Sequence, residues 1–296
     1  MPGYSFSDYV QLTLSGASTG SIYALIALGF VTIYSVTGII NFAQGEFAML
    51  GAMLAVSYQK VMPLPLATVG AILTVTLLGL AMERIVIRPA RRATPITWII
   101  ITIGVDIALR GTALLIWGTT PYALPSFSPG PPLHLFGAVL SRQRVWIAGS
   151  MVVILIGLWF FLERTMMGKA VRACAVNPRA ADLMGISPQR MSALSFGLSA
   201  ALGAVAGIVI APLTLVSYDI GLTLGLKGFV AAVMGGLVNA PAAVAGGLLL
   251  GLLESWGAGL LSSGFKDAIA FVLLFVILFL KPEGLFGRAE SAQTSL

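Results

Sequence analysis

Long runs of apolar residues fill most of the chain, and charged residues cluster in the segments between them. A helix needs about 20 apolar residues to cross the hydrocarbon core of a bilayer. The pattern therefore predicts a series of membrane-crossing helices. The simple runs cover residues 10–34, 41–59, 64–83, 95–117, 145–162, 191–212 and 265–280.

A further apolar region, residues 225–254, is broken between Gly235 and Pro241. It is either one long kinked helix or two shorter pieces that enter and leave on the same side. Lys281 and Arg288 predict a cytoplasmic tail, so the last run must travel inward and the broken region must begin and end outside. This favours the paired or re-entrant arrangement. Non-helical backbone at membrane depth also requires protein or a water-filled cavity around it.

The basic residues predict the orientation. Loops 83–95 and 163–190 hold nine of the 17 Lys and Arg residues and are expected to be cytoplasmic. The proline-rich segment 118–144 and the N-terminus then lie outside. The nine residues are Arg84, Arg88, Arg91, Arg92, Arg164, Lys169, Arg172, Arg179 and Arg190.

Composition supports a membrane protein without an enzymatic site. Of the 296 residues, 58% are hydrophobic and only 9% are charged, against roughly 25% charged in soluble domains. We expect residues 1–296 to form a single all-α polytopic domain with about eight crossings. The single Cys174 and single His134 exclude an internal disulfide and Cys or His metal clusters. No nucleotide-binding or hydrolase motif occurs, so we expect no enzyme activity, metal or cofactor, and no nucleic-acid partner.

Polar residues interrupt the second run within GIINFAQGEFAMLG, residues 38–51. Asn41, Gln44 and Glu46 lie where an apolar solvent would penalise them, so they are expected to face the bundle interior or a polar path. Glu46 has a structural alternative, in which its carboxylate accepts hydrogen bonds from backbone N–H groups freed at Gly45. Broken segments in both halves predict a transport path between inverted pseudo-repeats.

Other charges interrupt later runs. Asp106 and Arg110 are one helical turn apart and are expected to pair; a polar lining for a substrate with amino and carboxylate groups is the alternative. Lys227 is expected near the outer surface, where it attracts a substrate carboxylate or snorkels. Glu254 is expected to mark the end of a segment, and Asp267 the start of the last span.

The loop at 163–190 contains a predicted short helix. Pro178 can occupy its first turn, and Gly185 can end it. This helix would expose Arg179 and Asp182 together with apolar side chains. It is either a bare connection or a docking helix for a groove on a soluble partner.

Several stretches together resemble one known family. GIINFAQGEFAMLGA, RACAVNPRAADLMGIS, LKGFVAAVMGGLVNAPAAVAGGLLLGLLE and the ending KPEGLFGR are similar to permeases of branched-chain amino acid ABC importers, of the LivH type. The resemblance covers nearly the whole chain. It implies a subunit of an ATP-driven amino acid importer in the bacterial inner membrane. We expect transport to proceed by alternating access. Its implied partners are a second, LivM-like permease, two cytoplasmic ATPases that bind the ATP, an external substrate-binding protein and membrane lipid.

The resemblance also implies roles for individual residues. The loop helix becomes an ATPase-coupling element, formed by Asn177, Pro178, Arg179, Ala180, Ala181, Asp182, Leu183, Met184, Gly185 and Ile186. The translocation path would be lined by Asn41, Gln44, Gly45, Glu46, Ala231, Ala232, Gly235 and Gly236. Gln44 stands where the family often has His, and Gln does not titrate.

Two other functions stay open at this point. A secondary transporter working alone would use Glu46 or Asp106 as a proton or sodium site. A passive pore would carry a small neutral solute such as urea. The exact substrate, and whether the permease pairs with a copy of itself or with a different chain, are left open.

Overall fold

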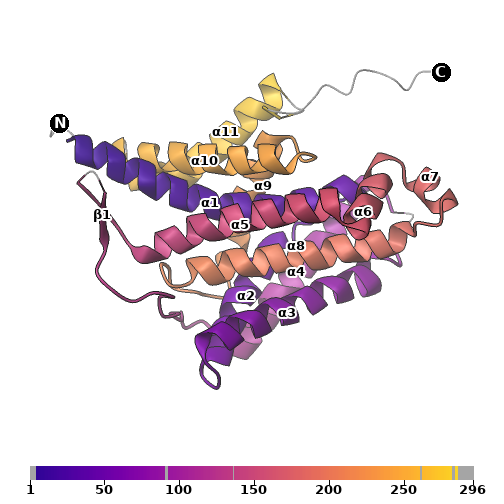
Figure 1. The fold of residues 1–296 in the computed structure, drawn as a ribbon, viewed down its shortest axis with the longest axis horizontal. Coiled ribbons are helices and arrows are strands. Elements are labelled where there is room, and N and C mark those ends of the chain that lie inside the picture. The colour runs from indigo at the N-terminus through magenta and orange to yellow at the C-terminus, as the bar shows by residue number, and fades with distance from the viewer. Residues whose placement is uncertain (1–4, 91–92, 136, 261, 282–283, 286–296) are drawn as a thin grey trace.

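Helices aligned along one axis make up nearly all of the protein (Figure 1). The computed structural model describes all residues except 1–4, 91–92, 136, 261, 282–283 and 286–296. Arg91, Arg92 and Arg288, used above for the orientation, lie outside the described residues. The all-α polytopic architecture is confirmed, because six described helices are long and apolar enough to cross a membrane.

The long helices follow the expected runs closely. They are α1 (Phe6–Thr37), α2 (Gln44–Gln59), α3 (Leu64–Met82), α4 (Pro95–Trp117), α5 (Arg142–Arg164), α8 (Pro188–Ile210), α9 (Ile220–Gly235), α10 (Ala240–Leu260) and α11 (Lys266–Leu280). Shorter elements connect them: a π-helical turn η1 (Glu83–Ile87), α6 (Met166–Val176), α7 (Pro178–Leu183), a hairpin of β1 (Leu133–Leu135) and β2 (Ala138–Leu140), and the turn η2 (Ser263–Phe265).

The second run becomes helical only at Gln44, after a non-helical stretch. Gly38 ends α1 in a left-handed conformation, with φ of 66°, which glycine adopts without strain. Residues 38–43 then carry the chain back into the bundle. The side chain of Asn41 accepts a hydrogen bond from Ala43 N, and its carbonyl accepts one from Gln44 N. These bonds satisfy backbone groups at the start of α2.

The broken region forms two helices rather than one kinked helix. Gly236, with φ of 93°, ends α9, and α10 begins at Ala240. The segment before α9 pairs with the 118–144 segment through Tyr122 and Val216. The far part of α10 contacts the start of α1, where Ser255 donates to Leu12 O. The region therefore begins and ends toward the same side, as expected.

Contacts between loops define the two ends of the bundle. Arg88 donates to Gln189, so the segments that follow α3 and precede α8 share one end, which we call the basic end. Gln11 exchanges hydrogen bonds with Val139 at the opposite end, where the N-terminal turn of α1 meets the hairpin. The grouping of loops agrees with the expected topology. The cytoplasmic location of the basic end stays a prediction.

The packing shows an internal repeat. In this repeat α1 is equivalent to α8, α2 to α9 and α3 to α10. The contact of α1 with α10 is then equivalent to that of α8 with α3. The contact of α2 with α8 is likewise equivalent to that of α9 with α1. Helix α1 runs toward the basic end, whereas α8 runs away from it, so the halves are inverted. Glycine pairs bring α1 and α10 close, because Gly20 lies against Gly247 and Gly251.

Candidate functional site

Gln44 anchors the start of α2 deep in the bundle. Its Nε2 donates to Ser199 O at 3.1 Å, and Ser199 Oγ donates to its Oε1 at 2.5 Å. The same hydroxyl also lies 2.9 Å from Gly29 O. The Gln44 side chain is fully buried, and these bonds satisfy its polar atoms without a charge. Helix α2 thus begins between α1 and α8, away from both ends of the bundle.

The N-terminal turns of α2 and α9 meet at three glycines. A Cβ atom at Gly45 would lie 2.0 Å from the Gly221 carbonyl oxygen and 2.7 Å from Gly225 Cα. Only glycine permits this approach. Each helix has 16 residues and is about 24 Å long, which is shorter than the ~30 Å hydrocarbon core. The site therefore contains two short helices with their positive ends together.

The carboxylate of Glu46 lies at this junction. A Cβ at Gly221 would be 2.7 Å from both Glu46 oxygens. Arg110 of α4 approaches it, with Nε 3.5 Å from Oε1, and the same guanidinium contacts Asp106 Oδ2 at 2.5 Å. The predicted pairing of Asp106 with Arg110 is confirmed, but the pair also reaches across to Glu46.

The alternative role of Glu46, in which its carboxylate accepts hydrogen bonds from backbone N–H groups freed at Gly45, is wrong. Among the described residues, neither carboxylate oxygen of Glu46 accepts a hydrogen bond, and Arg110 Nε is likewise without one. Glu46 therefore does not bind the backbone N–H groups freed near Gly45. The start of α2 is satisfied instead by Asn41.

The other predicted path residues lie at the opposite end of α9. Ala231 and Ala232 are buried, and Gly235 packs against Ala243 of α10. Gly236 forms the turn between the two helices. These residues shape the contact of α9 with α10. The residues of α9 that meet the 41–46 stretch come earlier, at Gly221, Gly225 and Phe229. The spacing of those two glycines was the available signal in the sequence.

Two expectations for charged residues are corrected. Lys227 neither snorkels nor lies at a surface: it is buried and bound to Glu254, and Nζ lies 2.8 Å from Asp267 Oδ1. Glu254 is buried within α10 instead of marking its end, and it also accepts a hydrogen bond from Tyr23 OH at 2.6 Å. Burial in hydrocarbon requires such partners. Asp267 does mark the start of α11.

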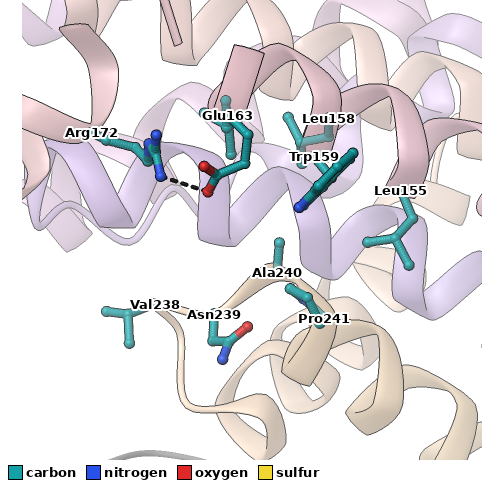
Figure 2. A pocket seen from close by; sticks show the side chains of 10 residues that line it. Leu155, Leu158, Trp159, Glu163, Arg172, Val238, Asn239, Ala240 and Pro241 are labelled. Carbon is teal, nitrogen blue, oxygen red and sulfur yellow. Dashed lines mark hydrogen bonds and ion pairs between the residues drawn. The ribbon is translucent and has the colours of Figure 1, made fainter. Parts of the chain in front are cut away.

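A cavity of about 550 Å³ opens at the basic end (Figure 2). Trp159 and its neighbours on α5 face the turn between α9 and α10, and the ion pair of Arg172 with Glu163, at 2.5 Å, stands at one side. The cavity adjoins the predicted path at the turn beside Gly236. The lining residues are Leu155, Leu158, Trp159, Leu162, Glu163, Arg172, Val238, Asn239, Ala240 and Pro241.

The predicted short helix is present as α7. Asn177 caps it by accepting a hydrogen bond from Ala180 N at 3.0 Å. Gly185, with φ of 83°, follows its end. Ala181 is buried in a cluster with Met191 of α8, whereas Leu183 and Met184 are 89% and 82% exposed. Figure 1 shows α7 at the extremity of the basic end.

Comparison with known proteins gives matches over the whole bundle. Residues 12–278 match the family model described as the branched-chain amino acid transport system permease component. The chain is 35% identical to the high-affinity branched-chain amino acid transport system permease protein BraD of Pseudomonas aeruginosa, over 95% of this chain and 97% of that protein. It is 34% identical to the LivH permease protein of Escherichia coli, over 96% and 97%.

A more distant similarity links the chain to a sugar permease. The ribose import permease protein RbsC of Haemophilus influenzae is 26% identical over 87% of this chain and 80% of its own length. No solved structure matches the chain.

Proposed function

The chain belongs to the family of branched-chain amino acid transport permease components, and on that premise we propose that it serves an ATP-binding cassette importer as a transmembrane subunit. Its cargo is a branched-chain or related amino acid, and transport runs into the cytoplasm. The relatives' names supply the substrate class. The chain has no nucleotide-binding motif of its own, so its energy comes from separate ATPase subunits.

The exposed apolar end of α7 is the observation that supports coupling to an ATPase. Leu183 and Met184 are 89% and 82% exposed, and α7 lies at the extremity of the basic end (Figure 1). The helix is capped at both ends and held to α8 by Ala181. A rigid helix with an apolar tip fits a groove on a soluble subunit. Movement of α7 would be transmitted directly to α8.

The proposed mechanism is alternating access between the two inverted halves. Helix α8 contacts α2 at Gln44, and α2 contacts α9 at Gly45. A displacement of α8 by the ATPase would therefore reach the junction of the two short helices. The passage would run past this junction, between this chain and a second permease subunit in the bacterial inner membrane. An external binding protein would deliver the amino acid at the opposite end.

The coupling role is tested by charge substitutions at the tip of α7. The complete complex, with both permeases, the ATPases and the binding protein, is reconstituted in proteoliposomes. We expect Leu183→Asp and Met184→Asp each to lower ATP-driven uptake about tenfold or more, because an unpaired charge in a desolvated contact costs more than about 1.4 kcal/mol. The stimulation of ATP hydrolysis by the substrate-loaded binding protein should fall together with uptake.

Val61→Asp is the matched control. Val61 is 81% exposed and lies in the loop between α2 and α3, at the opposite end. This variant should keep uptake within about twofold of the unmodified chain. Full activity of the α7 variants would refute the coupling role. Uptake by this chain alone under an ion gradient, without ATPases, would instead favour a secondary transporter built on Glu46 or Asp106.

A further inference from the structure

Three charged side chains at the junction of α2, α4 and α9 do not balance one another. Arg110 contacts both Glu46 and Asp106, so one guanidinium faces two carboxyl groups, and the cluster has a net charge of −1 when both are ionised. Glu46 is 0% exposed and Asp106 is buried. An uncompensated charge in such a place is costly, and buried charges are normally paired. The cluster therefore lacks one positive charge.

The carboxylate without hydrogen bonds is that of Glu46. Both of its oxygens are buried and accept no hydrogen bond from any described residue. Its contact with Arg110, at 3.5 Å, is longer than a hydrogen bond, whereas the contact of Arg110 with Asp106 is 2.5 Å. The positive ends of α2 and α9 favour an anion here, but their stabilisation is smaller than the desolvation cost of a carboxylate. A cationic hydrogen-bond donor would balance the charge of the Glu46 carboxylate and supply the hydrogen bonds that it lacks.

The cluster is reachable from one side. The Arg110 side chain is 24% exposed, and α4 is otherwise a peripheral helix whose buried residues are few. An arginine at this depth does not face lipid without a large penalty, so this face of α4 must border water or a partner subunit. A solute that moves along it would meet Arg110 first and the two carboxylates behind it.

We infer that Glu46, Asp106 and Arg110 form the subsite of the translocation path that receives the ammonium group of an amino acid. The inference rests on the proposed function. A primary ammonium group carries one positive charge and three donors, which supply the charge and the hydrogen bonds that Glu46 lacks. Arg110 holds the two carboxylates together. The subsite thus selects for a solute that carries an ammonium group over an uncharged solute.

The inference predicts that uptake follows the net charge of the cluster. Asp106→Asn makes the cluster neutral, and the ammonium group then has no charge to balance. Arg110→Gln added to Asp106→Asn restores a net charge of −1 at Glu46. We therefore expect the single variant to lose about tenfold or more in leucine uptake. The double variant, although it has lost two of three residues, should recover to within about threefold of the unmodified complex.

The measurement is ATP-driven leucine uptake by the reconstituted complex, together with stimulation of ATP hydrolysis by the loaded binding protein. Stimulation should persist in both variants, because neither Asp106 nor Arg110 lies on α7 or α8, the helices through which the ATPase is proposed to act. A structural role would instead lower uptake and stimulation together, and the double variant would be no better than the single one. Glu46→Gln also makes the cluster neutral, so it should lose leucine uptake as Asp106→Asn does. It replaces Asp106→Asn as the test if that variant does not assemble.

Asp267→Asn is the control, because it removes a carboxylate from the other cluster of paired charges, at Lys227. It should leave uptake within about twofold. Uptake by Asp106→Asn equal to that of the unmodified complex would overturn the subsite. A second result would also overturn the subsite: uptake by the unmodified complex that depends on pH between about 6 and 8, with no such dependence in Asp106→Asn. The positive charge that balances the cluster would then come from a proton and not from the substrate. Absence of uptake of every branched-chain or related amino acid by the unmodified complex would overturn the proposed function itself.

Discussion

At the scale of single residues, the charged side chains inside the bundle are placed by partners far away in the sequence. Lys227 of α9 binds Glu254 of α10 and Asp267 of α11, and its ammonium lies 5.7 Å from the centre of the Tyr23 ring. Each charge alone would be costly in an apolar medium. Together these residues connect α1, α9, α10 and α11. The cluster therefore helps to fix the position of α11 against the bundle.

Lys227→Met should destabilise the protein strongly. The substitution keeps the apolar stem of the side chain but leaves Glu254 buried without its cation, which costs about 3–5 kcal/mol. Thermal unfolding of the detergent-solubilised complex measures the effect. Lys227→Met combined with Glu254→Met should recover most of the loss, because no buried charge is then unpaired. A double variant as unstable as the single one would contradict this explanation.

At the scale of elements, α6 joins α7 to the bundle. Its buried face packs Val171 and Cys174 against Val36 of α1 and Met191 of α8. Burial raises the pKa of the Cys174 thiol, and the carboxylate of Asp182 on α7 adds to the effect. A raised pKa leaves less thiolate at neutral pH, and the thiolate is the reactive form.

Cys174 should therefore react slowly with a maleimide at pH 7 in the folded complex. Labelling should quicken as the pH rises through and above the usual thiol range, and it should become complete after denaturation. Val176→Cys in a Cys174→Ser background is the control, because position 176 lies on the same helix and is exposed. Equal labelling rates for the two thiols at pH 7 would show that α6 does not pack as described.

At the scale of the whole molecule, the two inverted halves pack against each other through small residues. Helix α10 of the second half lies along α1 of the first, and a Cβ at Gly247 would be 2.5 Å from Ala24 N. Between helices in a membrane, close packing of this kind replaces the hydrophobic driving force. The contact of α1 with α10 is thus a main attachment between the halves.

Gly247→Leu should disrupt the bundle. The new side chain meets the backbone of α1, which cannot yield as a flexible side chain would, and overpacking of this kind costs about 1–3 kcal/mol or more. Yield of monodisperse complex and its unfolding temperature are the measurements. Gly149→Leu in α5 is the control, because nothing lies within 4 Å of a Cβ there. Similar behaviour of the two variants would refute the close contact.

The prediction from sequence succeeded where one local property decides the structure. Apolar length located the spans of α3, α4 and α5, and Pro178 with Gly185 located α7 to within one residue. The break between α9 and α10 followed from glycine, proline and the basic residues of the tail. For the candidate site, the sequence identified Glu46 and the pairing of Asp106 with Arg110. It did not identify Gly221 or Gly225, which touch Gly45 only because the two short helices converge.

The sequence by itself determined that this protein is a bundle of apolar helices with interrupted segments in both halves, because hydrophobic length and backbone-breaking residues act locally. Only the tertiary structure decided which polar residues meet. It placed Lys227 and Glu254 inside the bundle rather than at its surface, and it left Glu46 without hydrogen bonds between two helix N-termini. Apart from the one-turn pair of Asp106 with Arg110, a buried charge here is stabilised by partners that the fold brings within a few ångströms from distant segments, and no local pattern records them.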